Sequence, residues 1–309
     1  SATEKYVKQT KSYKVYTDKN GYRYSGKKRN EKIDKSAIFL GDSFTYGMGL
    51  SYDKTFVGLL ENDKKDFNFY NLGVAGYSPT VYLYQLREII KNGITPSKIF
   101  LTLDISDVKD EASKWKIDGE TQKPIYIFKK KIKAKKLSFK QKNFKGSRLI
   151  ARNINNFFRN IRLSFLTQNN EPIIDPGKTV RGSFLYLNLE ETDQSLWRPV
   201  GFNGSLNKIK NNIHEISKIS KSIGAEFYIL IYPWPDTLYY GTDKFGWENF
   251  AKTVCNDNNC RGVINLFPEF KKIHNEKFDW YYNLYIGNDL HISEKGQKII
   301  AEKILTQAF

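Results

Sequence analysis

Short continuous hydrophobic runs alternate along this chain with stretches whose hydrophobic residues recur at helical spacing. The runs at 36–41, 67–74 and 98–106 are typical of strands covered on both faces, and helical patterns at 54–62 and 78–93 follow the first two. The alternation returns with a helical stripe at 205–224, strands at 225–235 and 262–267, and a closing helix at 293–305. This order predicts an α/β fold with a central parallel sheet of about five strands and helices on both faces.

The alternation also divides the chain. Residues 1–35 are polar and rich in turn signals, so we expect an extended N-terminal lead-in, and residues 36–309 are predicted to form a single domain. Residues 108–200 do not fit the alternation and are interpreted as an insertion between the third and fourth strands. In a parallel sheet the ligand site lies beyond the carboxyl ends of the strands, where polar residues follow these runs.

The insertion carries most of the positive charge. The net charge is +17, and residues 114–162 hold 16 Lys or Arg residues against two acidic residues, Asp118 and Glu120. This basic segment favours an anionic polymer or an anionic membrane surface as partner, and specific nucleic-acid binding is not expected. Residues 150–165 form an amphipathic helical pattern that either packs on the core as a cap or lies on a membrane surface.

The two cysteines, Cys255 and Cys260, lie close together. They form either a disulfide, which would place the protein in an oxidising compartment, or two free thiols; a metal site would need further ligands nearby. The only methionine is Met48, and no 20-residue apolar stretch is present. We expect an extracytoplasmic protein, periplasmic or at the cell surface, whose leader or membrane anchor precedes residue 1.

Four short motifs follow the predicted strands or precede the last helix: "GDSFTYG" at 41–47, "NLGVAGYS" at 71–78, "LDISDVKDE" at 103–111 and "NDLHISEKG" at 288–296. Together they resemble the SGNH hydrolase superfamily, also called the GDSL esterase and lipase family. The resemblance covers residues 36–107 and 205–307 and leaves the insertion unexplained. It implies a three-layer α/β/α, flavodoxin-like fold.

The resemblance also implies a catalytic dyad. Ser43 matches the family's nucleophile, whose own backbone N–H contributes to the oxyanion hole; the alternative role for Ser43 is an N-cap of the following helix. The nucleophile needs a histidine as general base, and His291 occupies the family's position before the last helix. His214 and His274, in contrast, are expected to be solvated.

The remaining site residues match the family less closely. Asp289 is the predicted orienting acid, although many members have an aspartate at the position of Asn288. Gly76 matches the second oxyanion donor, with Gly73 as the alternative. Ser106 stands where the family has asparagine, so we expect its hydroxyl to replace the amide in the oxyanion hole.

We also predict Asp42 and Trp234 as substrate-binding residues. The expected activity is cleavage or transfer of an O-acyl group, foremost O-acetyl, on a cell-envelope or extracellular carbohydrate through an acyl-enzyme, without metal or organic cofactor. The alternatives are a lipid-directed esterase and a catalytically degenerate carbohydrate-binding protein. Water or a sugar hydroxyl can complete the reaction, and the sequence does not distinguish hydrolase from acyltransferase.

Overall fold

The protein is described here from a computed structural model, which covers residues 13–127, 199–240, 245–258, 260–287 and 289–309. Most of the basic segment, the predicted helix at 150–165 and Asn288 lie outside these ranges. In the described part of the chain, none of the helices has the length and hydrophobicity that a bilayer span requires.

A seven-stranded sheet forms the centre of the fold, in the order β1-β2-β4-β3-β5-β8-β9. Its five parallel strands, taken in chain order, have the flavodoxin-like order 2-1-3-4-5, so the predicted fold class is confirmed. The strands are β1 (Tyr16–Thr17), β2 (Arg23–Tyr24), β3 (Ser36–Leu40), β4 (Asn68–Asn71), β5 (Lys98–Thr102), β8 (Glu226–Ile231) and β9 (Gly262–Asn265).

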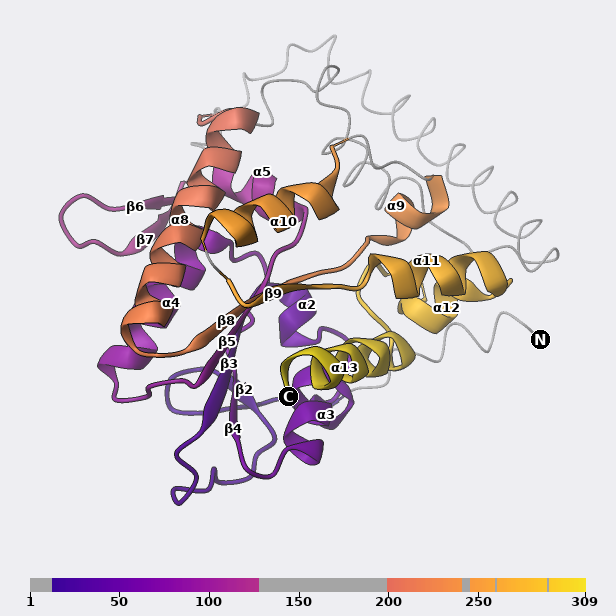
Figure 1. Ribbon diagram of the computed structural model, residues 1–309, viewed down its shortest axis with the longest axis horizontal. Helices are drawn as coiled ribbons and strands as arrows, with labels where there is room; N and C mark the ends of the chain where they lie inside the picture. The colour runs from indigo at the N-terminus through magenta and orange to yellow at the C-terminus, as the bar shows by residue number, and fades with distance from the viewer. Residues whose placement is uncertain (1–12, 128–198, 241–244, 259, 288) are drawn as a thin grey trace, which may run out of the picture.

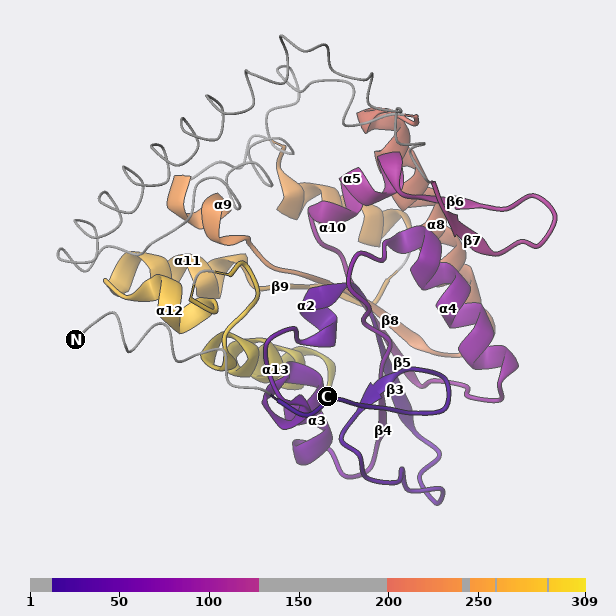
Figure 2. The same cartoon turned by 180° about the vertical axis from the view of Figure 1, so that it is seen from behind.

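Helices cover both faces of the sheet (Figures 1 and 2). On one face α4 (Pro79–Lys91) packs on α8 (Phe202–Ser222), and α10 (Trp247–Asp257) lies over β8 and β9. On the other face α3 (Phe56–Asp63) packs against α13 (Glu294–Ala308). The central strands are therefore buried on both sides, which explains why they read as continuous hydrophobic runs rather than alternating ones.

The shorter elements lie mainly at the carboxyl end of the sheet. They comprise the helices α2 (Ser43–Tyr46), η1 (Tyr52–Lys54), α5 (Ser106–Ser113), α9 (Pro235–Tyr240), α11 (Phe267–Glu276) and α12 (Trp280–Leu284), and the hairpin of β6 (Trp115–Ile117) with β7 (Pro124–Tyr126). Figure 1 shows this hairpin projecting beyond α4 and α8.

The structure adds two observations at the sequence-based boundaries. Residues 13–35 do not merely lead into the domain, because β1 and β2 pair antiparallel and β2 continues the sheet beyond β4. The segment after residue 107 is also tied to the core at first, since α5 packs against α8. These contacts join segments that are far apart in the chain, so the local hydrophobic periodicity does not predict them.

The helix predicted at 205–224 starts three residues earlier, at Phe202 of α8. Gly201 occupies its N-cap position, and the hydroxyl of Ser205 donates to the Phe202 carbonyl inside the first turn rather than capping it. The two cysteines form a disulfide, Cys255–Cys260, which ties the end of α10 to the approach to β9. Of the two alternatives for these cysteines, the structure has the disulfide.

Candidate active site

Ser43 lies just beyond the carboxyl end of β3, on the first residue of the four-residue helix α2. Asp42 caps this helix, since its Oδ1 accepts the Phe44 N–H at 2.9 Å. A Cβ on Gly41 would lie 2.0 Å from the Thr45 Oγ1, so the turn from strand to helix requires glycine there. The helix cap is thus Asp42, and the Ser43 hydroxyl, which lies 3.4 Å from the Asp42 Oδ2, has a second and closer partner.

That partner is His291, which a short antiparallel hairpin carries toward Ser43. Tyr285 and Ile292 form a β-bridge, and the Ile286 N–H donates to the His291 carbonyl at 2.8 Å. Two residues after the histidine, Ser293 caps α13 by accepting the Gly296 N–H. The histidine is therefore fixed between a bridge and a helix start.

The three side chains predicted for the triad come together. The Ser43 Oγ lies 2.9 Å from the His291 Nε2, and the His291 Nδ1 lies 2.7 Å from the Asp289 Oδ1. In the tautomer that satisfies both contacts, Nδ1–H donates to the carboxylate and Nε2 accepts the serine proton. This is the arrangement that a serine nucleophile needs for activation.

The Asp289 carboxylate is partly exposed, with 45% of its side chain accessible. Partial burial alone would raise its pKa, but the hydrogen bonds from His291 and the charge of that histidine outweigh this effect and place the pKa of Asp289 below its usual value. The Asp289 side chain is therefore a carboxylate at neutral pH.

The His291 ring packs against Phe44, which is itself packed against two other aromatic rings. The Phe44 ring lies 5.0 Å from the His291 ring, between centroids, and contacts the rings of Tyr232 and Trp234 on its other sides. Because Phe44 follows the nucleophile directly, the same four-residue helix positions both Ser43 and the packing surface for its base. The sequence shows Phe44 only as part of the motif.

The β4–α4 loop packs directly against the nucleophile turn. A Cβ on Gly73 would lie 2.3 Å from the Tyr46 N, and the Val74 N–H donates to the Gly41 carbonyl at 3.1 Å. The Gly73 N–H is taken by the Asn71 side chain, so this glycine serves close packing. Within the described ranges the Gly76 N–H has no acceptor, as an oxyanion donor requires, and a φ of 75° favours glycine there.

Ser106 is the first residue of α5, and its N–H donates to the Asp104 Oδ1 at 2.5 Å. The oxyanion role expected for the Ser106 hydroxyl stays a prediction. Asp104 also accepts hydrogen bonds from the Tyr232 hydroxyl and the Trp234 indole N–H, at 2.9 and 2.6 Å. Asp104 was not among the residues expected at the site, although an acid that follows a buried strand was a signal for it.

The two predicted substrate-binding residues support the site instead of presenting a surface. Asp42 is 5% exposed and caps α2, and Trp234 is 7% exposed with its indole N–H on Asp104. We therefore correct both assignments. Burial, followed by the negative charge of Asp104, raises the pKa of Asp42 well above its usual value, and burial raises the pKa of Asp104 as well.

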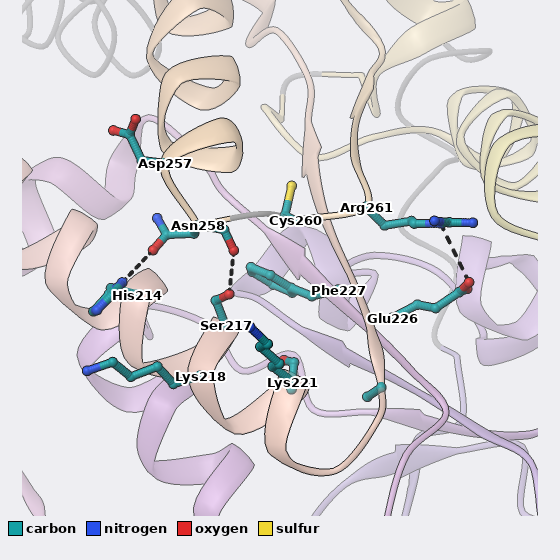
Figure 3. Close-up of a pocket in the computed structure, with 12 residues that line it drawn as sticks. His214, Ser217, Lys218, Lys221, Glu226, Phe227, Asp257, Asn258, Cys260 and Arg261 are labelled. Carbon is teal, nitrogen blue, oxygen red and sulfur yellow. Dashed lines mark hydrogen bonds and ion pairs between the residues drawn. The ribbon is translucent and has the colours of Figure 1, made fainter.

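The other two histidines lie away from Ser43. His214 borders a surface hollow of about 580 Å³ at the amino ends of β8 and β9, opposite the catalytic edge, and its Nδ1 contacts the Asn258 side chain (Figure 3). His274 packs on Trp280 in α11–α12. In the part of the chain that the structure describes, no cluster of three or more potential metal-ligating side chains occurs.

Solved structures with a similar arrangement include TesA, with 11% identity, a TM-score of 0.49, and 88% of this chain and 97% of that chain covered. An acetyl xylan esterase, AlAXEase, has 11% identity and a TM-score of 0.47, with 89% of this chain and 100% of that chain covered. A lipolytic protein of the G-D-S-L family from Veillonella parvula has 14% identity and a TM-score of 0.46, with 88% of this chain and 97% of that chain covered. These likenesses concern the fold and not the activity.

No curated protein matches the sequence. A family model described as "Protein of unknown function (DUF1574)" matches residues 1–176. Because this match spans more than half of the 309 residues, the chain belongs to the DUF1574 family.

Proposed function

We propose that this protein is a serine-dependent ester hydrolase whose nucleophile is Ser43. The observation that carries the proposal is the continuous hydrogen-bonded chain from the Ser43 Oγ through His291 to Asp289. The Gly76 N–H, which has no acceptor among the described residues, and the backbone N–H of Ser43 at the start of α2 offer donors for a developing oxyanion.

The proposed reaction has two stages. His291 accepts the Ser43 proton as the Oγ attacks the ester carbonyl, and the tetrahedral intermediate collapses as His291 protonates the leaving alcohol. The acyl group is then carried as an ester on Ser43. Water, activated by the same imidazole, releases it as the carboxylic acid, whereas a sugar hydroxyl in place of water would complete a transfer.

The proposed substrate is a short O-acyl group, foremost acetyl, on a cell-envelope or extracellular carbohydrate. Next to Gly76, the Trp115 ring contacts Tyr77 and the exposed Tyr126, and its indole N–H donates to the Gly76 carbonyl. The ammonium group of Lys114 also lies beside Gly76. Aromatic edges with a cation beside the oxyanion loop suit an anionic carbohydrate, and the Cys255–Cys260 disulfide favours an extracytoplasmic location.

The test compares hydrolysis of p-nitrophenyl acetate by the wild type, Ser43→Ala and His291→Ala, with His214→Ala as the matched histidine control. We expect Ser43→Ala and His291→Ala to fall to background and His214→Ala to keep the wild-type rate. A wild-type rate that survives the loss of Ser43 would overturn the proposal.

The acyl and acceptor preferences need a second measurement. Release of acetate from acetylated polysaccharides, compared with hydrolysis of esters from two to twelve carbons, separates the carbohydrate substrate from a lipid. A preference for chains longer than about eight carbons would replace the carbohydrate proposal by a lipid-directed esterase. Tight polysaccharide binding without Ser43-dependent turnover would instead indicate a binding protein.

A further inference from the structure

The four-residue helix that carries Ser43 is too short to be stable alone. A single helical turn costs more conformational entropy than its hydrogen bonds return, so tertiary contacts have to hold α2 in place. The Asp42 cap holds its amino end. At its carboxyl end, Gly47 adopts a left-handed conformation, and the Gly47 and Met48 N–H groups both return to the Ser43 carbonyl at 3.1 Å.

The carbonyls beyond this helix are bound by one side chain from the N-terminal segment. The guanidinium of Arg23 on β2 donates to the carbonyls of Tyr46, Gly47 and Leu50, at 2.5 and 2.9 Å for the first two. Arg23 is 1% exposed and also lies over the Tyr46 ring, 4.6 Å from its centroid. Within the described ranges no carboxylate forms an ion pair with Arg23 and its buried Nε has no hydrogen-bond partner, so these carbonyls and the Tyr46 ring are its contacts.

Asn71, which is paired with Arg23 across the sheet, also binds the carboxyl end of α2. Asn71 on β4 is the antiparallel partner of Arg23, and its side-chain amide donates to the Thr45 carbonyl at 2.8 Å. The cross-strand pair thus binds successive carbonyls at the end of α2. A cation at a helix carboxyl end is also favourable electrostatically.

The turn at 46–50 extends toward the segment that carries His291. The Gly49 N–H donates to the Tyr13 hydroxyl at 3.0 Å, so a second lead-in residue holds the turn at 46–50. A Cβ on Gly49 would lie 2.5 Å from the Ile286 side chain, and Ile286 is bonded through its backbone to His291. The turn therefore contacts elements that carry both members of the dyad.

We propose that Arg23 is a positioning residue for the Ser43 nucleophile, so that β2 supports the site through this one side chain. The inference rests on the proposed function. Arg23 acts through the backbone: it keeps α2 and the turn at 46–50 in one conformation, and thereby keeps the Ser43 Oγ within hydrogen-bonding distance of His291. Since small errors in alignment cost large factors in rate, its loss lowers kcat more than it changes KM.

Arg29 provides a matched control on the same segment. It donates to the Phe69 carbonyl of β4, pairs with Asp18 and lies over the Tyr70 ring, but it does not contact the turn at 46–50. The experiment measures kcat, KM and thermal unfolding for Arg23→Gln, Arg23→Lys and Arg29→Gln with a short acyl ester, well below each unfolding midpoint. Addition of guanidinium ion at millimolar concentration to Arg23→Ala tests chemical rescue.

We expect kcat of Arg23→Gln to fall roughly 10- to 100-fold with KM within about twofold, Arg23→Lys to be intermediate, and guanidinium to restore part of the rate to Arg23→Ala. Arg29→Gln keeps the wild-type kcat. Equal losses of kcat in Arg23→Gln and Arg29→Gln, or a loss that follows only the fraction unfolded, would overturn the proposal.

Amide hydrogen exchange gives a readout that needs no ester. In Arg23→Gln, or in Arg23→Lys where the glutamine variant does not fold, the Gly47 and Met48 amides should exchange faster than in the wild type, and in Arg29→Gln they should not. Unchanged exchange would refute the role of Arg23. If the wild type shows no Ser43-dependent turnover, the proposed function fails, while the exchange result still decides whether Arg23 holds the turn.

Discussion

Asp289 and His291 are two residues apart in the chain, and their side chains meet at 2.7 Å between the carboxylate Oδ1 and the imidazole Nδ1. The Asp289 N–H donates to the Ile286 carbonyl, and the Tyr281 hydroxyl donates to the Asp289 carbonyl, so the loop holds the carboxylate in line with the ring. The proposed orienting acid and base therefore belong to one local structure, and the proposed nucleophile comes from another.

Replacing the orienting acid should reduce turnover. In Asp289→Asn, the side chain can no longer stabilise the imidazolium that forms when His291 accepts a proton, so we expect kcat to fall by about 100-fold with little change in KM. The loss is smaller than for a fully buried acid because Asp289 is partly exposed. Steady-state kinetics on a short acyl ester measure it, and Asp279→Asn, an exposed aspartate on the same segment, is the control.

The close packing of Gly73 on the nucleophile helix predicts a steric effect. In Gly73→Ala the added methyl group would meet the Tyr46 N at 2.3 Å and has to displace either the loop or α2. We expect a loss of roughly 1–3 kcal/mol in the free energy of unfolding and a clear fall in kcat. Gly119→Ala, where a Cβ meets no atom within 4 Å, should change neither. Wild-type activity in Gly73→Ala would contradict this packing.

The raised pKa of Asp110 predicts that the stability of the folded protein depends on pH. Burial raises its pKa to about 6, although its ion pair with Lys114 opposes the shift. The folded protein therefore binds this proton more tightly than the unfolded chain, whose aspartate has a pKa near 3.9. The contribution of Asp110 to the free energy of unfolding is largest below pH 4. It decreases by roughly 3 kcal/mol as the pH rises to about 6.

Urea unfolding of the wild type and Asp110→Asn at pH values between 4 and 8 measures this contribution. The difference in unfolding free energy, wild type minus variant, should decrease as the pH rises and then level off above pH 6. The exposed Asp66→Asn serves as the control. A difference that stays constant across the range would show that Asp110 titrates as it does in the unfolded chain.

The disulfide should contribute to stability and not to turnover. Cys255 and Cys260 close a short loop at the amino end of β9, opposite the catalytic edge of the sheet. From loop-closure entropy, its removal should cost about 2 kcal/mol. We expect reduction, or the Cys260→Ser substitution, to lower the unfolding midpoint while kcat at low temperature stays unchanged. A parallel loss of kcat in the folded, reduced protein would connect this loop to the site.

The local pattern was sufficient for the main strands and helices of the core, and the resemblance of the short motifs pointed to Ser43 and His291. Strands such as β3 and β5 read as continuous apolar runs because both of their faces are buried, and helices such as α4 show their buried stripe at helical spacing. Ser43 and His291 were located because each is part of a short motif next to such an element. Parallel topology then predicts that their strand ends share one edge of the sheet.

Only the tertiary structure decided how the remaining residues act. Asp42 and Trp234 read as substrate contacts, but both side chains are buried, Asp42 as the cap of α2 and Trp234 with its indole N–H on the carboxylate of Asp104. Arg23 lies in a polar segment whose sequence gives no sign that its guanidinium is buried against α2. These roles depend on contacts between residues far apart in the chain, which a local pattern of side chains does not encode.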